Sequence, residues 1–172
     1  RKDGVLRRQF KMPTVCPCCA EPVVRKDGEA AYRCVNDMCP GRASRSLIHF
    51  VSKDAMNIDG LGASQIEMLI EEGFIENIPD IYKLHLHRDS LIALERMGEK
   101  SVDNLLAAID KSRSNELYRL IYGLGIRQVG IKAAKELTKV YKSMSDIIKA
   151  SREDIASIPE FGNITADFIC SY

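Results

Sequence analysis

The sequence predicts a mainly α-helical protein in which a small cysteine-rich module with a short β-hairpin precedes an all-α array of four repeats. Three observations lead to this prediction. Five of the six cysteines fall within 24 residues, apolar residues recur at helical spacing after Ser44, and one five-residue frame that ends in glycine occurs four times. A length of 172 residues, with 45% hydrophobic and 28% charged side chains, fits one or two folded domains and excludes disorder throughout.

Charge is unevenly distributed along the chain, although its formal sum is only +1. Residues 1–53 carry a net charge of +6, residues 54–110 carry −8 and residues 111–172 carry +3. The small sum argues against a uniformly basic nucleic-acid binder, but it leaves two basic segments that are able to meet an anionic partner.

No apolar run approaches the roughly 18 residues that a membrane helix needs, and residues 1–10 are basic and polar rather than signal-like. We therefore expect a cytosolic protein with no membrane partner. Because the chain begins at Arg1 and ends directly after an apolar helical pattern, we also expect it to be a fragment of a longer protein.

The first module contains a predicted β-hairpin. Val23-Val24 and residues 31–33 flank Lys26-Asp27-Gly28, and an Asp-Gly pair favours the tight turn that joins two antiparallel strands. Prolines and glycines interrupt the chain on both sides of it, so we expect the helical part to begin only after Ser44.

The clustered cysteines predict a metal site. Cys16 and Cys19 form one close pair, Cys34 and Cys39 form a second, and fourteen residues separate the pairs. In a cytosolic chain this spacing favours a metal over disulfides, and four thiolates are the usual ligand set of a tetrahedral Zn²⁺. Because four thiolates leave no place for a reactive water, we predict one structural Zn²⁺ in a module of residues 13–44.

Alternatives remain at this module. Cys18 is able to replace Cys19 as a ligand, although two intervening residues are the usual spacing. We otherwise expect Cys18 and Cys170 to be spare thiols, with Cys170 facing the core. A redox role for Cys16 and Cys19 is a weaker interpretation, because no βαβ pattern surrounds them.

The remaining chain, residues 45–172, contains the repeated frame of an apolar residue, two further residues, an apolar residue and a glycine. The four glycines are spaced by 36, 32 and 32 residues, and apolar or small residues follow each glycine by four and by seven positions. This pattern predicts a helix, a tight turn and a second helix in every repeat. The tetratricopeptide solenoid has a similar period, but its signature residues are missing. The frames are Ile58–Gly62, Leu94–Gly98, Ile126–Gly130 and Ile158–Gly162.

Polar links separate the repeats and contain their own helix signals. Ser143 with Asp146 and Ser151 with Asp154 have the spacing at which a serine caps a helix N-terminus. We therefore expect short helices to begin at these serines.

The repeated turns predict a binding surface for phosphate. Glycine permits a positive φ and a close backbone approach, and the helix that follows begins with unpaired N–H groups. Main-chain donors and the helix dipole then favour an anion without a basic side chain. Such sites hold a DNA backbone without reading its bases.

The charge map ranks the third turn first, since Arg127 and Lys132 lie in it and Lys135 follows one helical turn later. The second turn offers Arg96 and Lys100, whereas the first and fourth lack nearby basic residues and depend on main-chain donors. The predicted DNA contacts are Gly60, Gly62, Arg96, Gly98, Lys100, Gly125, Arg127, Gly130, Lys132 and Gly162.

Nearly the whole chain resembles the bacterial NAD-dependent DNA ligases. The resemblance is carried by the four-cysteine module running through Cys39-Pro-Gly-Arg42, and then by Met56–Gly62, Leu94–Ser101 and Tyr122–Gly130 in that order. It implies a C4 zinc finger followed by four helix-hairpin-helix motifs around Gly62, Gly98, Gly130 and Gly162. By the same resemblance, residues 1–12 are the trailing end of an oligonucleotide-binding (OB) domain, and a BRCT domain follows Tyr172.

The resemblance further implies a parent enzyme that seals nicks in duplex DNA during replication and repair, using NAD and Mg²⁺ bound outside this fragment. The zinc ligands of the family correspond to Cys16, Cys19, Cys34 and Cys39. The glycine that usually follows the second of them is Ala20 here. The adenylation motif Lys-x-Asp-Gly is absent, since Lys2-Asp-Gly and Lys26-Asp-Gly lack the intervening residue. We therefore predict no catalytic or NAD-binding residue, and no activity of the fragment alone.

Together these observations predict the duplex-DNA-binding region of an NAD-dependent DNA ligase, which grips the phosphate backbone and minor groove independently of sequence. Its expected partners are nicked double-stranded DNA and the adenylation, OB and BRCT domains of the same bacterial, nucleoid-associated enzyme, which we expect to be a monomer. The alternative is a zinc-stabilised helical protein-interaction scaffold whose acidic segment, residues 54–110, docks a basic partner.

Overall fold

The structure is a computed structural model that describes residues 10–25, 30–36, 38–95 and 97–172. It divides into two compact units, Arg1–Ala43 and Ser44–Tyr172, a division one residue before the boundary predicted at 44/45. The predicted remnant of an OB domain, residues 1–12, lies largely outside the described residues. Among the described residues, no helix has the length and apolar character needed to cross a membrane.

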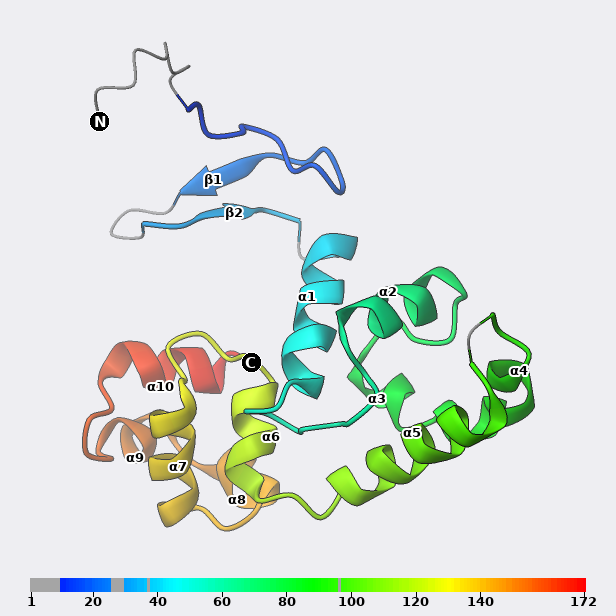
Figure 1. Cartoon of the computed structure of the whole chain (residues 1–172). Coiled ribbons are helices and arrows are strands. Elements are labelled where there is room, and N and C mark those ends of the chain that lie inside the picture. The colour runs from blue at the N-terminus through cyan, green and yellow to red at the C-terminus, as the bar shows by residue number, and fades with distance from the viewer. Residues whose placement is uncertain (1–9, 26–29, 37, 96) are drawn as a thin grey trace, which may run out of the picture. The chain divides into compact units, whose positions relative to one another are not determined.

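The first unit contains the predicted hairpin. Strand β1 (Val23–Arg25) pairs antiparallel with β2 (Tyr32–Cys34), with Val23 opposite Cys34 (Figure 1). An isolated bridge between Val15 and Pro22 extends this pairing towards the first cysteine pair. The two strands are confirmed, and the predicted Lys26-Asp27-Gly28 turn lies outside the described residues.

Helices form the second unit, and Figure 1 labels most of them. The first helix begins at Pro40, earlier than expected, because a proline is well accommodated in the first turn, where its missing N–H has no partner to lose. The unit boundary at Ala43/Ser44 therefore falls within this helix. The helices are α1 (Pro40–Val51), α2 (Ala63–Glu71), α3 (Ile78–Ile81), η1 (Leu84–His87), α4 (Arg88–Ile92), α5 (Glu99–Ser112), α6 (Leu117–Gly123), α7 (Ile131–Val140), α8 (Met144–Lys149), α9 (Arg152–Ala156) and α10 (Asn163–Cys170).

The four repeats are four helical hairpins, as predicted. Hairpin 1 joins α1 and α2 through Gly62, hairpin 2 joins α4 and α5 through Gly98, hairpin 3 joins α6 and α7 through Gly130, and hairpin 4 joins α9 and α10 through Gly162. The residues four and seven positions after each glycine are all buried, which confirms the helical pattern on which the prediction rested: Ile66, Leu69, Val102, Leu105, Ala134, Leu137, Ala166 and Ile169.

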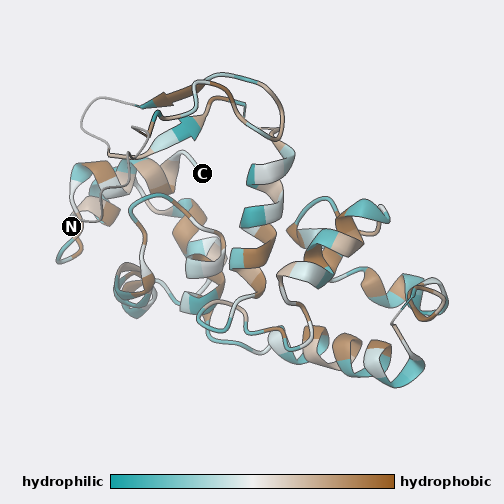
Figure 2. Ribbon diagram, turned by 45° about the horizontal axis from the view of Figure 1, so that its top comes forward, coloured by the Kyte–Doolittle hydropathy of each residue, from teal (hydrophilic) through white to brown (hydrophobic). Residues whose placement is uncertain are grey.

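Two separate apolar cores hold the hairpins in pairs. One core unites hairpins 1 and 2 around Phe50, Leu69 and Val102. The other unites hairpins 3 and 4 around Ile121, Leu137 and Ile155. Apolar and polar residues alternate around these helices in Figure 2, as expected of helices that bury one face.

Helix α6 ties the second pair of hairpins to the first. A Cβ atom added to Gly123 of α6 would lie 3.2 Å from Cδ2 of Phe50 of α1, so this glycine permits a close approach of α6 to α1. Arg119 donates hydrogen bonds to the carbonyl oxygens of Lys53 (3.0 Å) and Ala55 (2.7 Å). His49 Nε2 lies 2.8 Å from the carbonyl oxygen of Tyr122, which gives this histidine a structural partner.

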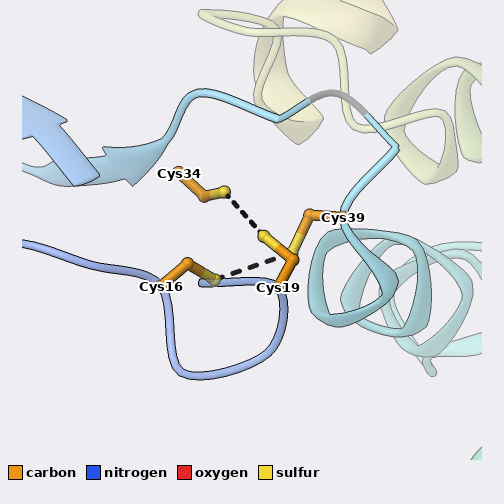
Figure 3. A group of neighbouring side chains, drawn as sticks. All are labelled: Cys16, Cys19, Cys34 and Cys39. Atoms are coloured by element: carbon orange, nitrogen blue, oxygen red, sulfur yellow. Dashed lines mark hydrogen bonds between the residues drawn. The ribbon is translucent and has the colours of Figure 1, made fainter. Parts of the chain in front are cut away.

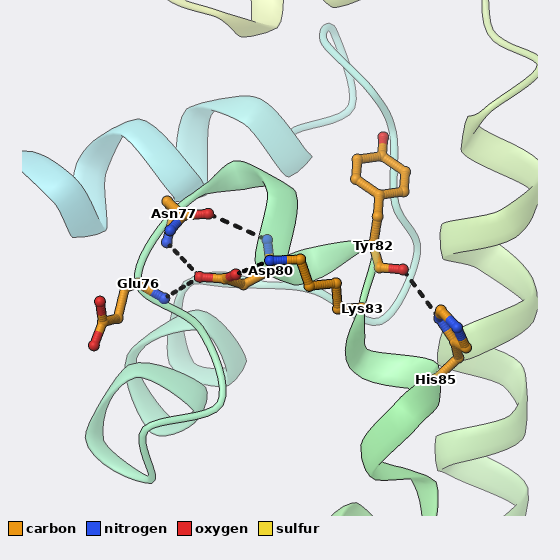
Figure 4. A network of polar contacts seen from close by, with 6 residues as sticks. All are labelled: Glu76, Asn77, Asp80, Tyr82, Lys83 and His85. Carbon is orange, nitrogen blue, oxygen red and sulfur yellow. Dashed lines mark hydrogen bonds and ion pairs between the residues drawn. The ribbon is translucent and has the colours of Figure 1, made fainter.

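Three short helices, α3, α8 and α9, carry side-chain caps at their N-termini. Ser143 and Asp146 form a reciprocal capping box at α8, and Ser151 accepts a hydrogen bond from the N–H of Asp154 at α9, so both predicted helix starts are confirmed. Asn77 and Asp80 form the same kind of box at α3, within the polar network that Figure 4 shows.

Candidate metal centre and nucleic-acid interface

The four cysteines selected from the sequence lie together in the first unit. Their sulfur atoms all lie within 4.8 Å of one another, and Figure 3 shows the side chains of Cys16, Cys19, Cys34 and Cys39 converging. Sγ of Cys16 lies 3.7 Å from Sγ of Cys39, and Sγ of Cys19 lies 3.4 Å from Sγ of Cys34. The hairpin register brings the two pairs together, because β2 ends at Cys34 while the Val15 bridge holds the chain before Cys16.

This arrangement fits a tetrahedral zinc ion. Four sulfur ligands about 2.3 Å from one Zn²⁺ lie about 3.8 Å from each other, close to the 3.7 Å between Cys16 and Cys39. Cys16 and Cys39 are buried, and Cys19 and Cys34 are half-buried, so the site is shielded from solvent. A closed set of four soft sulfur donors supports a structural zinc and offers no open position for a reactive water.

Backbone hydrogen bonds shape the first cysteine pair. The N–H of Cys16 donates to the carbonyl of Glu21 at 2.8 Å, and the N–H of Ala20 donates to the carbonyl of Cys16 at 2.9 Å. The turn closes with Ala20 at a φ of 60°, a left-handed conformation that glycine adopts more readily than alanine. The position at which this chain departs from the resembled family is therefore a strained turn beside the metal site.

The protein environment moves the thiol pKa values in opposite directions. Hydrogen bonds from the backbone amides of Cys18 and Cys19 lower the pKa of Cys16 to about 6. Burial raises the pKa of Cys34 to about 12. Cys16 is thus prepared as a thiolate at neutral pH, whereas Cys34 favours its neutral form until a metal ion compensates the charge.

Two cysteines lie outside the cluster. Cys18 is exposed, and its side chain lies against the first turn of α1, where a Cβ atom on Gly41 would be 2.6 Å from the Cys18 sulfur. Cys170 is also exposed, so the expectation that it faces the core is wrong. It follows the buried Ile169, and consecutive residues of a helix point about 100° apart.

The glycines of the four frames adopt a conformation that the sequence interpretation did not anticipate. Gly62, Gly98, Gly130 and Gly162 each form the N-cap of a helix with extended backbone and a negative φ between −77° and −116°. The expectation that the glycine between the helices supplies a positive φ is therefore wrong for these four residues. An extended N-cap is a conformation available to any residue.

The positive φ lies two residues before the frame glycine. Gly60 has a φ of 87°, Gln128 of 63° and Glu160 of 70°, and the equivalent residue of hairpin 2, Arg96, lies outside the described residues. Gly125 also has a positive φ, of 69°. Gly60 and Gly125 thus have backbone reasons to be glycine, whereas the frame glycines do not.

Packing within the chain does not explain the frame glycines either. A Cβ atom added to Gly98, Gly130 or Gly162 would find no described atom within 4 Å, and one added to Gly62 would meet only the Gln65 side chain, at 3.0 Å. None of the four helices receives a side-chain cap. The start of the second helix of each hairpin is therefore an open surface without a side-chain cap.

Basic residues lie near two of these helix starts in the sequence. Lys100 and Lys132 are exposed and occupy the same place in hairpins 2 and 3, two residues after the glycine. The guanidinium carbon of Arg127 lies 4.7 Å from the centre of the Phe168 ring, and Nζ of Lys135 lies 4.9 Å from the centre of the Tyr118 ring. At hairpin 3, aromatic rings of α10 and α6 thus lie against the side chains of Arg127 and Lys135.

Two features of this surface were missed from the sequence. Glu160 accepts a 2.6 Å hydrogen bond from Nζ of Lys132 and raises the pKa of that lysine above its ordinary value. A shallow hollow also lies between the tips of hairpins 3 and 4 and is lined by Gln128, Gly162, Asn163, Ile164 and Thr165. The sequence signal that could have identified Glu160 is its position two residues before the frame glycine. Gly60 occupies this position in hairpin 1 and Gln128 occupies it in hairpin 3.

Comparisons with known proteins agree with this organisation. The family model for the NAD-dependent DNA ligase C4 zinc finger domain matches residues 15–40, and the model for the helix-hairpin-helix motif matches residues 119–172. Among the similar proteins is the DNA ligase of Acetivibrio thermocellus, 51% identical over 90% of this chain and 23% of that protein. The DNA ligases of Clostridioides difficile and Bacillus subtilis are each 48% identical, over 95% and 96% of this chain and 24% of their own lengths. The chain therefore spans about a quarter of the length of these relatives.

Proposed function

We propose that this chain, a segment of the NAD-dependent DNA ligase family, binds duplex DNA through the phosphate backbone at the open helix starts of its four hairpins. One observation carries the proposal: all four helices that follow a frame glycine, α2, α5, α7 and α10, begin without a side-chain cap, whereas α3, α8 and α9 are capped by side chains. Side-chain caps are also absent from η1, α4 and α6, but no frame glycine precedes those helices. Side-chain caps therefore occur in this chain, but none of them lies at a helix that follows a frame glycine.

A phosphate is the partner that such helix starts favour. Their first-turn N–H groups lack intrahelical partners, and the helix dipole places partial positive charge at the same point. With hydrogen in place of a side chain, a DNA backbone is able to approach the amides of the first turn directly. Neither φ nor packing inside the chain requires glycine at positions 98, 130 and 162, which supports a close approach from outside.

Side-chain charge adds to the main-chain donors at hairpins 2 and 3. Lys100 and Lys132 extend from the first turns of α5 and α7, and Arg127 lies in the loop before Gly130. Gly60, Gly62 and Gly162 contribute main chain without a neighbouring cation in the frame, whereas Gly125 lies two residues before Arg127. Arg96 belongs to the same proposed set. Because these groups address phosphates, binding to the backbone and along the minor groove is independent of base sequence.

In the parent enzyme the segment would hold nicked DNA for phosphodiester formation elsewhere. We assign it no catalytic residue and no NAD or Mg²⁺ site, which we place in the remainder of the ligase together with its adenylation, OB and BRCT domains. The zinc ligands we propose are Cys16, Cys19, Cys34 and Cys39, which would fix the shape of the first unit. We further propose that the segment is monomeric and works in the bacterial cytoplasm.

Binding of the zinc-loaded chain to fluorescent duplexes tests the proposal. We expect similar dissociation constants for nicked duplexes of three unrelated sequences, together with a steep loss of affinity as salt rises. A strong preference for one sequence would contradict it. No binding even at low salt would contradict it too, and would favour the alternative of an interaction scaffold whose acidic segment, residues 54–110, docks a basic protein.

A further inference from the structure

One ion pair joins the tips of hairpins 3 and 4. Nζ of Lys132, the second residue of α7, lies 2.6 Å from Oε1 of Glu160 in the loop before α10. Both side chains are largely exposed, at 71% and 59%. The pair therefore lies on the surface that the proposed function assigns to DNA, where a phosphate is able to reach it.

The backbone fixes the place of the carboxylate. Glu160 has a φ of 70°, a left-handed conformation that favours glycine, and it occupies the frame position at which hairpin 1 has Gly60. Glycine would satisfy this turn with less strain and without a charge. A glutamate here directs a negative charge to the tip of the hairpin, beside the helix start at Gly130.

Hairpin 2 provides an internal comparison. Lys100 follows Gly98 by two residues, as Lys132 follows Gly130, and both glycines are uncapped, extended N-caps. Among the described residues, Lys100 forms no ion pair, whereas Lys132 is held by Glu160. The two lysines thus share a position and differ in whether a carboxylate competes for them.

We infer that Glu160 is an affinity-determining residue of the DNA-binding surface, because it competes with a DNA phosphate for Lys132. The inference rests on the proposed function. A phosphate that reaches Lys132 displaces the carboxylate, and the displaced carboxylate then lies beside the DNA backbone. Both effects weaken binding at hairpin 3 and make it less dependent on salt, since a lysine already paired to a carboxylate contributes less to counterion release. Glu160 therefore sets hairpin 3 to bind less tightly than its uncapped helix start with Arg127 and Lys132 would bind alone.

The variant Glu160→Gln removes the charge and keeps the size of the side chain. We expect it to bind nicked duplex about two- to fivefold more tightly at low salt, and to steepen the slope of log affinity against log salt by about 0.9, the value for one additional phosphate contact. The matched control is Asp110→Asn near the C-terminal end of α5, which makes the same charge change and breaks an exposed ion pair with Arg113. We expect this control to change both quantities by less than half as much.

Repeating the Glu160→Gln substitution in a chain that also carries Lys132→Gln tests whether Glu160 acts through Lys132. There the effect of Glu160→Gln is expected to fall to that of Asp110→Asn, because no lysine remains for the carboxylate to hold. An undiminished gain in that background, or a gain no larger than that of the control, would overturn the inference. Weaker binding by Glu160→Gln would also overturn it, since the pair would then act by holding the two hairpins together.

Failure of the inference is distinguishable from failure of the proposed function. If the unsubstituted chain binds no DNA, the proposed function itself fails. If the unsubstituted chain binds DNA and Lys100→Gln weakens that binding while Glu160→Gln leaves it unchanged, the proposed function stands and only the role of Glu160 is wrong. Thermal unfolding followed by circular dichroism establishes that every variant compared is folded.

Discussion

Arg88 on α4 holds Asp103 on α5 through two hydrogen bonds, one from Nε at 2.7 Å and one from Nη2 at 2.9 Å. Arg152 and Asp167 form the same two-point contact between α9 and α10, 64 residues further along the chain. The same interval separates Gly98 from Gly162. The contact therefore marks the second hairpin of each pair, and the helical unit consists of two versions of one two-hairpin element.

The Arg88–Asp103 contact predicts a pH-dependent contribution to stability. Its hydrogen bonds lower the pKa of Asp103 below the ordinary value of about 3.9. A lowered pKa in the folded state stabilises the fold fully above the ordinary value and is lost as the pH falls through the lower, folded-state pKa. We expect Asp103→Asn to lower the melting temperature at pH 7, and the difference from the unsubstituted chain to close progressively below about pH 3.9.

Thermal unfolding at pH 7, 5 and 3 measures this difference. The control is Glu67→Gln, which removes an exposed carboxylate on α2. A gap for Asp103→Asn that stays constant between pH 7 and 3 would show that the hydrogen-bonded carboxylate is not its source.

The cysteine cluster predicts a fixed metal and thiol content. We expect one zinc per chain by elemental analysis, and two thiols, those of Cys18 and Cys170, that react without denaturant. A strong chelator should release the zinc, expose six reactive thiols and open residues 13–39 to proteolysis, because two short strands are the regular structure found in the described part of this segment. The helical circular dichroism signal should largely remain. Six freely reactive thiols in a chain purified without chelator would exclude the site.

Relief of the strained turn at Ala20 should stabilise the metal-bound module. The left-handed φ of 60° costs an alanine roughly 1–2 kcal/mol that a glycine avoids. Ala20→Gly should therefore tighten zinc binding in a competition with a chromophoric chelator. Ala43→Gly, within helix α1, serves as the control and should bring no such gain. Unchanged or weaker zinc binding by Ala20→Gly would mean that the turn relaxes when the metal is bound.

A bulky side chain at Gly130 should separate binding from folding. Its extended backbone suits any residue and a new Cβ atom meets nothing within 4 Å, so Gly130→Leu should change the free energy of unfolding by less than about 1 kcal/mol. The same side chain blocks the first-turn amides from a phosphate, and affinity for duplexes of unrelated sequence should fall about tenfold. Ser114→Leu, at an exposed position after α5, is the control for added apolar surface. Equal affinity losses for the two variants would exclude a specific role for the glycine.

Gly123 is expected to behave in the opposite way. A Cβ atom there would lie 3.2 Å from Phe50 and 3.4 Å from Ala55, so Gly123→Val forces apart the helix contact that joins the two pairs of hairpins. We expect a loss of roughly 1–3 kcal/mol in urea unfolding. The smaller Gly123→Ala should cost less, because helix propensity favours alanine. If valine were tolerated without loss, the close approach of α1 and α6 would not contribute to stability.

The sequence was most informative where local chemistry determines structure. The spacing of apolar residues identified the helix after each frame glycine, Ser143 and Ser151 identified helix starts, and Val23-Val24 identified a strand. Each of these signals depends on neighbours within a few residues. The same locality explains why Cys16, Cys19, Cys34 and Cys39 were selected, since two short pairs on turns need only one hairpin to bring them together.

Such local signals did not predict contacts between residues that lie far apart in the sequence. The Lys132–Glu160 pair and the Gly123–Phe50 contact join residues 28 and 73 positions apart, and each depends on how whole hairpins pack. The error over the frame glycines has a different origin. Glycine is compatible with both a left-handed turn and an extended N-cap, so residue identity alone did not distinguish Gly130 from the true left-handed residue, Gln128.

The division between capped and uncapped helices also bears on how the chain opens locally. Capping boxes at α3 and α8 hold the first turns of these helices with nearby side chains. The first turns of α5 and α7 receive no side-chain cap, so their leading amides lack that protection. Amide hydrogen exchange in the free protein should therefore be fastest at the hairpin tips, and any ligand that seats there leaves a protection pattern confined to those few amides. The exchange rates of the first-turn amides would thus show, residue by residue, which hairpins a ligand contacts.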